Sequence, residues 1–303
     1  MIKYILSKLE TFMNKDSLLI DEPMKNHTSF KVGGPVDLMI IPKTEDEVIN
    51  VLKLLASQPI PFYIMGNGSN LLVSDRGFSG VVIKLYDNYN DFSVDEDIIT
   101  AKSGILLSKL AKVALNHNLG GFEFASGIPG TLGGAVTMNA GAYGGEMKDV
   151  LISAHVVDRQ GNISEIVNGH LELGYRTSSI QKKDLIVLSA KLQLKKAPYD
   201  EIKDKMNELD HKRKDKQPLE WPSAGSTFKR PEGHFAGKLI QDCGLRGYSI
   251  GGAQVSEKHC GFIINKGGAT ANDIFNLICH VQETVYQKFG IHLDTEVKQL
   301  GEF

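Results

Sequence analysis

The spacing of apolar and polar residues predicts five amphipathic helices. Apolar side chains recur every three to four positions, which places them on one face of a helix. The predicted helices lie within residues 2–13, 43–58, 105–121, 199–218 and 270–290. Thr44 and Glu47 form a capping-box pair at the start of the second helix, and Gly120 lies past the end of the third.

Short apolar runs bounded by glycine, proline and polar turns predict strands between these helices. Residues 28–42 and 60–74 each read as strand, glycine turn and strand, and residues 91–104 and 150–167 read as hairpins. Further strands are expected over 80–85, 184–196, 225–230, 248–256, 260–268 and 291–301. The chain is therefore predicted to be α+β, in three parts: residues 1–85, 86–197 and 198–303.

Length and composition fit a multi-domain globular protein. The chain has 303 residues, 42% hydrophobic and 23% charged, which favours two or three domains. Its net charge of −2 gives no support for binding nucleic acid or a membrane surface.

The cysteines and the N-terminus indicate a cytoplasmic protein. Three cysteines (Cys243, Cys260 and Cys279) lie far apart, without the spacing of a zinc site or a disulfide framework. Lys8 and Glu10 interrupt the first apolar run, so it does not read as a signal peptide. No run of about 18 apolar residues predicts a membrane span. We expect no metal and infer no obligate protein partner.

The most unusual segment is glycine-rich. Residues 128–145, IPGTLGGAVTMNAGAYGG, contain six glycines among Val, Leu, Met and Ala, a composition unlike that of a flexible linker. Glycine is retained where the backbone needs a positive φ or a close approach. This backbone is therefore expected to lie against something large and flat, or against phosphates.

A second glycine loop, GNGSN at residues 66–70, resembles the start of a dinucleotide fingerprint. Leu71 stands where the third glycine belongs and a strand follows, so the Rossmann interpretation fails. EGHFAGKLI fails as a Walker loop, and SIQK is a chance SxxK match. Two glycine loops in adjacent α+β parts suit a dinucleotide held by backbone N–H groups, although tight turns alone remain the alternative.

Six motifs in order resemble one enzyme family. They are NHTSFKVGGPVD, GNGSNLLV, IPGTLGGAVTMNAGAYGGE, GYRTSS, PSAGSTFKRP and LDTEVKQLG, between residues 26 and 301. Together they resemble the UDP-N-acetylmuramate dehydrogenases, also called UDP-N-acetylenolpyruvoylglucosamine reductases or MurB. The short link from GYRTSS to PSAGS is similar to the compact (type II) branch of the family.

This resemblance implies an FAD-binding fold of the vanillyl-alcohol-oxidase (PCMH) type. Residues 1–85 and 86–197 would be two lobes with non-covalent FAD between them, and residues 198–303 a C-terminal substrate domain. The last strand, within 292–303, has the alternative of returning to the first lobe. The implied reaction uses NADPH to reduce UDP-N-acetylglucosamine enolpyruvate to UDP-N-acetylmuramate, for peptidoglycan synthesis. One site serving both substrates in turn predicts ping-pong kinetics.

The resemblance assigns catalysis to Arg176, Ser226 and Glu296. A guanidinium stabilises the substrate carboxylate while negative charge grows on the adjacent carbon. Ser226 would protonate that carbanion, and Glu296 would help if protonated, or by orienting Arg176 or a water. From the residues alone, each has a plainer interpretation: a surface arginine, a turn serine and an exposed strand glutamate.

The remaining expected contacts follow the same motifs. The basic end of the helix over 199–218 has two interpretations: a phosphate anchor, or a solvated face favoured by the helix dipole. FAD is expected at Gly66, Asn67, Gly68, Ser69, Asn70, Gly130, Thr131, Gly133, Gly134, Ala135, Asn139, Gly141 and Ala142. The substrate is expected at Tyr175, Arg213, Lys229, Arg230, Lys238 and Gln254.

Two departures from the family and two rival functions stay open. Lys298 replaces an expected arginine and cannot form a bidentate fork, and Trp221 replaces an expected tyrosine. One rival is another FAD oxidoreductase on the same fold, such as an alcohol or sugar oxidase. The other is a nucleotide-binding protein without catalysis. Retained flavin with lost substrate reduction after Ser226→Ala would separate an enzyme from a binding protein.

Overall fold

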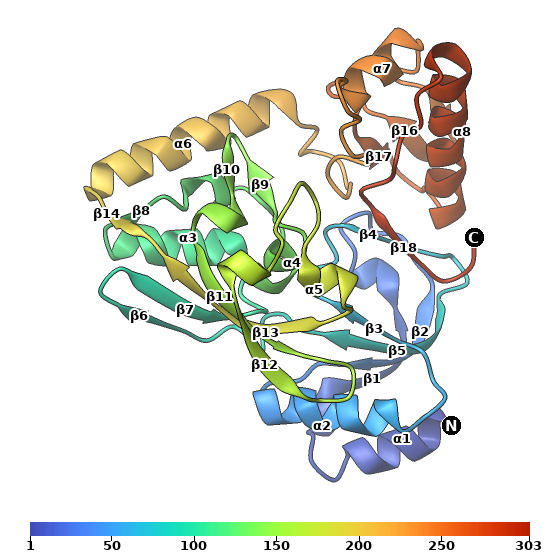
Figure 1. Ribbon diagram of the computed structural model, residues 1–303. Helices are drawn as coiled ribbons and strands as arrows, with labels where there is room; N and C mark the ends of the chain where they lie inside the picture. Colours follow the sequence, from blue (N-terminus) through green and yellow to red (C-terminus); the bar gives the residue numbers. More distant parts are fainter. The chain divides into compact units, whose positions relative to one another are not determined.

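The computed structural model describes residues 1–303, which divide into two compact units. Unit 1 comprises Met1–Ile20, Leu38–Asn67 and Gly80–Arg213, and unit 2 comprises Asp21–Asp37, Gly68–Ser79 and Lys214–Phe303. Both units mix helices and strands (Figure 1), which confirms the α+β prediction. The boundaries expected at residues 85 and 197 follow sequence order and stay a prediction.

Unit 1 holds most of the secondary structure. Its helices are α1 (Ile2–Leu9), α2 (Glu45–Ala56), α3 (Leu107–Asn116), α4 (Leu132–Thr137), α5 (Ser179–Lys182) and most of α6 (Tyr199–Lys216). Its strands are β3 (Phe62–Met65), β6 (Phe92–Asp95), β7 (Ile98–Lys102), β8 (Leu119–Gly120), β9 (Gly141–Ala142), β10 (Gly145–Glu146), β11 (Leu151–Val157), β12 (Ile163–Val167), β13 (Ile186–Gln193) and β14 (Lys195–Lys196). Strands β1 (Leu18–Pro23), β2 (Pro35–Ile40) and β5 (Phe78–Lys84) have residues in both units.

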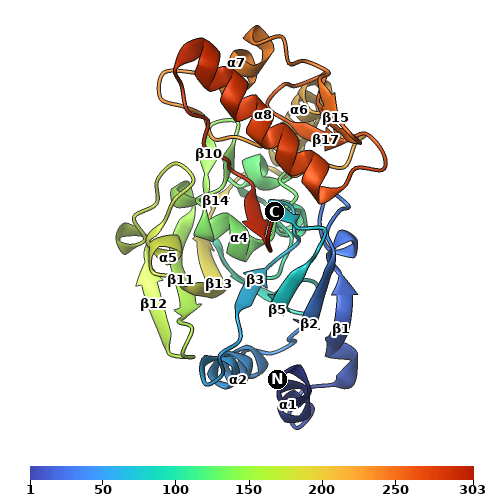
Figure 2. The same ribbon diagram turned by 90° about the vertical axis from the view of Figure 1, so that its right-hand side faces the viewer.

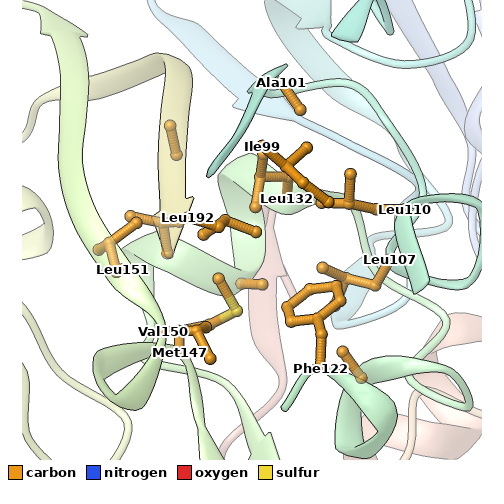
Figure 3. Packing of buried hydrophobic residues seen from close by; sticks show 14 of the residues in the cluster. Ile99, Ala101, Leu107, Leu110, Phe122, Leu132, Met147, Val150, Leu151 and Leu192 are labelled. Carbon is orange, nitrogen blue, oxygen red and sulfur yellow. The ribbon is translucent and has the colours of Figure 1, made fainter. Parts of the chain in front are cut away.

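A five-stranded sheet in the order β12-β11-β13-β7-β6 forms one core of unit 1. All of its neighbouring strands pair antiparallel. Buried side chains of α3 and α4 pack with those of β7, β11 and β13 (Figure 3). Leu107 and Leu110 of α3 lie in this cluster together with Leu132 of α4. The apolar residues of the glycine-rich segment, such as Leu132, therefore belong to the core of unit 1.

A second core of unit 1 contains α1 and α2, which lie side by side (Figure 2). The apolar face expected for this amphipathic helix is buried and includes Val48, Leu52 and Leu55. Its cap is only half of a capping box: the Thr44 hydroxyl accepts from the Glu47 N–H, but the Glu47 carboxylate accepts from the N–H of Lys43. The helix start was predicted correctly, and the reciprocal bond was not.

Unit 2 packs one long helix over a small sheet. Strands β15 (Ser249–Ile250), β16 (Ala253–Val255) and β17 (Ile263–Asn265) pair antiparallel, and α8 (Ala271–Phe289) lies against them (Figure 2). Unit 2 also contains α7 (Ala236–Asp242) and the parallel pair β4 (Leu71–Val73) and β18 (Lys298–Leu300). The Asp75 carboxylate accepts from the N–H groups of Ala271 and Asn272 at 2.8 and 2.9 Å, which ties the segment after β4 to the start of α8.

Several predicted strands differ from the structure. The strand expected at 28–32 is wrong: a turn closes between Thr28 and Lys31, whose φ of 60° is incompatible with a strand, and β1 lies earlier in the chain. The expected strand over 225–230 is irregular apart from one isolated bridge at Phe228, and the last strand is confined to β18. Helices α4 and α7 were not predicted, since glycines interrupt their apolar patterns. No helix has the length and hydropathy needed to cross a membrane.

Candidate active site

The two glycine loops contact each other within unit 1. The side-chain amide of Asn67 donates to the carbonyl oxygen of Pro129 at 2.7 Å. A Cβ added to Gly66 would overlap the Oγ1 of Thr131 and lie 3.0 Å from its Cγ2. The glycine at position 66 therefore allows the backbone of one loop to reach the side chains of the other.

A neighbouring segment fixes the second loop. Leu107 N–H donates to Gly130 O at 3.0 Å, and Gly133 N–H donates to Ser103 O at 2.8 Å. A Cβ on Gly133 would lie 2.8 Å from the Cβ of Ser103, so this glycine is required by the packing of the protein itself. The hydroxyl of Ser103 is buried and has no hydrogen-bond partner, a feature that nothing in the sequence signals.

Gly134 is different, because the protein around it does not require a glycine. It is exposed on α4, and a Cβ there would meet only the Oγ1 of Thr131, at an ordinary 3.8 Å. Glycine in a helix costs about 1 kcal/mol relative to alanine. Uncovered helical backbone at Gly134, close to a buried hydroxyl without a hydrogen-bond partner at Ser103, is compatible with a flat, polar ligand such as a flavin nucleotide.

The rest of the first loop continues into unit 2. The side-chain amide of Asn70 donates to the carbonyl oxygen of Glu296 at 3.1 Å, and Lys298 N–H donates to Asn70 O at 3.0 Å. Gly68 has a φ of 64°, and its carbonyl oxygen accepts from the N–H of Ser29 at 3.1 Å. Within unit 2, Asn70 of the GNGSN loop is thus attached to the backbone of the candidate Glu296.

Within unit 2, Ser226 and Glu296 lie on neighbouring segments. Glu296 N–H donates to the carbonyl oxygen of Thr227 at 2.8 Å, and Phe228 pairs with Thr295 in an antiparallel bridge. Thr227 is fully buried, whereas Ser226 is exposed and Glu296 half-buried. Two candidate residues 70 positions apart are therefore brought together, which no local pattern could predict.

Arg176 lies in unit 1, in a tight turn. The N–H groups of Gly174 and Thr177 each donate to the other's carbonyl oxygen, at 3.1 and 3.3 Å, and Arg176 between them has a φ of 55°. Its guanidinium lies 5.3 Å from the ring centroid of Tyr175, which is 52% exposed. The left-handed backbone of a non-glycine residue is uncommon and often marks a functional site.

Arg213, expected at the substrate, lies beside Gly127, the residue before the second glycine loop. A Cβ on Gly127, the residue before that loop, would lie 3.0 Å from Nη1 of Arg213. Burial lowers the pKa of the Arg213 guanidinium, and the nearby Tyr143 and Asp210 oppose this effect. The basic end of α6 therefore supplies a cation to the glycine-rich segment of unit 1.

The other expected substrate contacts in unit 2 have local partners. Lys229 Nζ lies 3.7 Å from Asp294 Oδ2, and Lys238 pairs with Asp242 at 2.7 Å. The guanidinium of Arg230 stacks over Phe235 at 3.9 Å. Gln254 donates to Gly247 O and Ser249 Oγ, each at 3.2 Å, and its Oε1 is buried without a partner.

The two residues that depart from the family pattern lie in unit 2. Lys298 is exposed on β18. Trp221 carries the ammonium of Lys266 over its ring, at 4.5 Å from the centroid. An aromatic surface is thus kept at position 221, with a cation stacked on it.

Comparison with known proteins connects both units to one enzyme family. Residues 36–166 match the model described as an FAD binding domain, and residues 217–300 match the C-terminal domain of UDP-N-acetylenolpyruvoylglucosamine reductase. The reductase of Clostridioides difficile is 55% identical over 298 residues, covering 98% of each chain. That of Caldanaerobacter subterraneus is 54% identical over 302 residues, covering 100% of each.

Solved structures agree in fold. The crystal structure of the reductase (MurB) from Thermus caldophilus aligns with a TM-score of 0.80 at 35% identity, covering 94% of this chain and 98% of that one. Alkyldihydroxyacetonephosphate synthase aligns with a TM-score of 0.52 at 19% identity over 64% of this chain and 41% of that one, a likeness of fold alone. The expected FAD-binding fold of the vanillyl-alcohol-oxidase type is confirmed. The chain therefore belongs to the UDP-N-acetylenolpyruvoylglucosamine reductase (MurB) family of FAD-dependent oxidoreductases.

Proposed function

We propose that this protein uses NADPH to reduce the enolpyruvyl ether of UDP-N-acetylglucosamine enolpyruvate to the lactyl ether of UDP-N-acetylmuramate. The activity in peptidoglycan synthesis follows from the family. The observation that carries the detailed reaction is the pairing of the Ser226 and Glu296 segments through Thr227 in unit 2. It supports a site where a proton donor and a carboxyl group act on one reacting carbon.

The two glycine loops would hold FAD non-covalently through backbone N–H groups and uncovered backbone. The open backbone at Gly134 and the buried hydroxyl of Ser103 support this assignment. The chemistry that bound FAD supplies is hydride transfer, taken from NADPH and given to the CH2 carbon of the enolpyruvyl group. The loop residues proposed to hold it are Gly66, Asn67, Gly68, Ser69, Asn70, Gly130, Thr131, Gly133, Gly134, Ala135, Gly141 and Ala142.

Arg176 would bind the carboxylate of the enolpyruvyl group. A guanidinium donates two parallel hydrogen bonds to a carboxylate and stays charged, so it stabilises the charge that grows beside the carboxylate during reduction. Its turn holds the guanidinium near Tyr175, which presents an exposed ring for the sugar or phosphate.

Ser226 would give its hydroxyl proton to the carbon next to the carboxylate. Serine is a weak acid, but a carbanion is basic enough to accept its proton. Glu296 would assist as a protonated acid, or by orienting Arg176 or a water molecule. Lys229, Arg230, Lys238 and Gln254 are proposed to bind the UDP moiety, and the buried Oε1 of Gln254 supports an acceptor role.

Arg213 is better proposed as a cofactor contact than as a substrate contact. Its position against Gly127, at the start of the glycine-rich segment, supports an interaction with the negative charge of the FAD diphosphate. The domain division at residues 85 and 197 is proposed on the same family likeness. NADPH would use the substrate's site in a ping-pong sequence.

An anaerobic half-reaction tests the proposal. The FAD-loaded protein is reduced with NADPH, freed of excess nucleotide and mixed with UDP-N-acetylglucosamine enolpyruvate, while the visible flavin band is followed. Return of the band on mixing supports the proposed reaction. A flavin that reduces but stays bleached would mean a different electron acceptor, and the roles of Ser226 and Glu296 would lose their basis.

A further inference from the structure

We infer that Asn139 and Glu146 are positioning residues that set the turn carrying Arg176. They would act on substrate reduction through Arg176, without touching substrate or cofactor. The inference rests on the proposed function, since it concerns the residue that binds the substrate carboxylate. It also assigns a second task to the glycine-rich segment: its C-terminal half holds a catalytic side chain of unit 1.

The turn needs outside support, because its central backbone conformation is disfavoured. Arg176 has a φ of 55°, in the left-handed region where a side chain crowds the backbone. The two hydrogen bonds between Gly174 and Thr177 close the turn and leave its direction to other contacts. A residue in this conformation persists only where the surrounding structure determines it.

Asn139 provides that support at the start of the turn. Its Nδ2 donates to the carbonyl oxygen of Gly174 at 3.1 Å and to Oε2 of Glu146 at 2.9 Å, while its Oδ1 accepts from the N–H of Lys148 at 2.9 Å. The residue is 1% exposed. Both amide donors are therefore used inside the protein, which fits a structural link better than the direct FAD contact expected from the sequence.

Glu146 brings a negative charge to the same place. Its Oε2 accepts from Asn139 and also lies 2.8 Å from Nζ of Lys148. The hydrogen bond from Lys148 lowers the pKa of the Glu146 carboxyl most, and the Asn139 amide and the charges of Lys148 and Arg176 act in the same direction. Glu146 is thus an ionised group that attracts the Arg176 guanidinium and fixes the amide that holds the Arg176 turn.

The far end of the turn is held by the same segment. The Ser178 hydroxyl donates to the carbonyl oxygen of Thr137, the last residue of α4, at 2.5 Å. Ser178 is fully buried. The segment over 174–178 is therefore attached at both ends to residues 137–146, so a change there would move Arg176 relative to its substrate.

The experiment compares Asn139→Asp and Glu146→Gln with wild type, all loaded with FAD. Asn139→Asp removes the two donors and keeps the shape, and Glu146→Gln removes the charge. Flavin is reduced anaerobically with dithionite and reoxidised with UDP-N-acetylglucosamine enolpyruvate. We expect each variant to retain FAD and to be reoxidised up to about 100-fold more slowly, with weaker substrate binding to the oxidised enzyme in a flavin-band titration.

Glu172→Gln is the matched control. Glu172 lies four residues before Arg176 and pairs with Lys182 at 2.7 Å on the exposed surface, so its variant should behave as wild type. Glu146→Gln should also have no effect in an Arg176→Ala background, because its action passes through Arg176. Glu146 is half-exposed, so the Glu146→Gln variant should fold. It therefore keeps the test valid if Asn139→Asp fails to fold.

Two outcomes would overturn the inference. Unchanged reoxidation and substrate affinity in Glu146→Gln would do so, as would an equal loss with and without Arg176, which means that both residues act independently. Wild-type protein that is not reoxidised by this substrate would refute the proposed function itself, and the positioning role with it. The two failures are distinguished by the wild-type trace alone.

Discussion

The side-chain amide of Asn67 donates a hydrogen bond to the carbonyl oxygen of Pro129 at 2.7 Å, between loops 62 residues apart in the chain. This bond links the two glycine loops that are proposed to hold FAD. It belongs to the protein itself, so its loss acts on the cofactor indirectly. A net hydrogen bond of this kind contributes about 0.5–1.5 kcal/mol.

Asn67→Ala is therefore expected to weaken FAD binding about 2- to 10-fold. The measurement is the dissociation constant of FAD, from quenching of flavin fluorescence on titration. Asn162→Ala is the control, because Asn162 donates a comparable bond to Asp158 in the β11–β12 turn. Equal FAD affinity in wild type and Asn67→Ala would mean that the loop spacing is set by packing alone.

Gly134→Ala separates a glycine needed by the protein from one needed by the ligand. A Cβ at position 134 meets only ordinary contact, and alanine favours the helix by about 1 kcal/mol, so the fold should be kept or stabilised. FAD affinity should nevertheless fall by about 10-fold or more, about 1.4 kcal/mol, if the cofactor lies against this backbone. The measurements are the thermal midpoint without added FAD and the FAD dissociation constant.

Gly133→Ala is the contrasting variant for this experiment. A Cβ there would lie 2.8 Å from the Cβ of Ser103, so stability and FAD affinity should fall together. If Gly134→Ala binds FAD as wild type does, the open backbone on α4 is not covered by the cofactor. The explanation offered for that glycine would then fail.

Arg213→Gln is expected to lower FAD affinity about 10- to 100-fold, because a charge-assisted hydrogen bond contributes about 1.5–3 kcal/mol. The loss should shrink at high salt, which screens the interaction with a diphosphate. Lys212→Gln is the control: Lys212 is exposed and pairs with Glu208 on α6. A loss of substrate affinity with unchanged FAD affinity would return Arg213 to the substrate site.

Elements with a strong and complete pattern could be predicted from the sequence. The amphipathic helices α2, α3 and α8 were predicted, since each has uninterrupted apolar spacing, and each buries its apolar face. Helix α4 was not, because Gly133 and Gly134 occupy its first turn and hide its period. β1 was also missed, and Lys31 turns the chain where a strand was expected.

The residues that carry the chemistry of the site could be predicted from the sequence, but the hydrogen bonds that hold the site together could not. The motifs around Arg176, Ser226 and Glu296 identify the family. By contrast, the bonds of Asn67 and Asn139 join residues 62 and 35 positions from their partners, and no local pattern specifies such pairs. Asn139 shows the consequence: its motif suggests a cofactor contact, while its amide is used within the protein.

His259 is expected to make stability depend on pH. Its Nδ1 accepts from the N–H of Gly261 at 3.1 Å and its ring packs edge-on against Phe262. Burial lowers the pKa of His259, and the charge of Arg246 acts in the same direction. The imidazole of the unfolded chain, with a pKa of about 6.5, therefore binds a proton more readily than that of the folded protein. The stability that neutral His259 provides is present above this pH and is lost as the pH falls below it.

Urea unfolding between about pH 5 and 8 measures this contribution. Wild type should lose stability below about pH 6.5 more steeply than His259→Gln, by at most about 1.4 kcal/mol per pH unit for one proton. His211→Gln, at an exposed position of α6, is the control. Parallel pH profiles for wild type and His259→Gln would show that this half-buried imidazole does not govern acid stability.

Ser226→Ala separates the two halves of the proposed reaction. Removing a general acid typically costs about 10²- to 10⁴-fold in rate, and only the step that needs a proton on carbon should be affected. Reduction of flavin by NADPH should therefore stay within about 2-fold of wild type, while reoxidation by UDP-N-acetylglucosamine enolpyruvate should slow by that larger factor. Stopped-flow absorbance of the flavin band measures both steps on one sample.

Ser223→Ala, three residues earlier in the same segment, is the control for Ser226→Ala. Equal slowing of both half-reactions would point to a disturbed flavin, and unchanged reoxidation would mean that another group or a water molecule donates the proton.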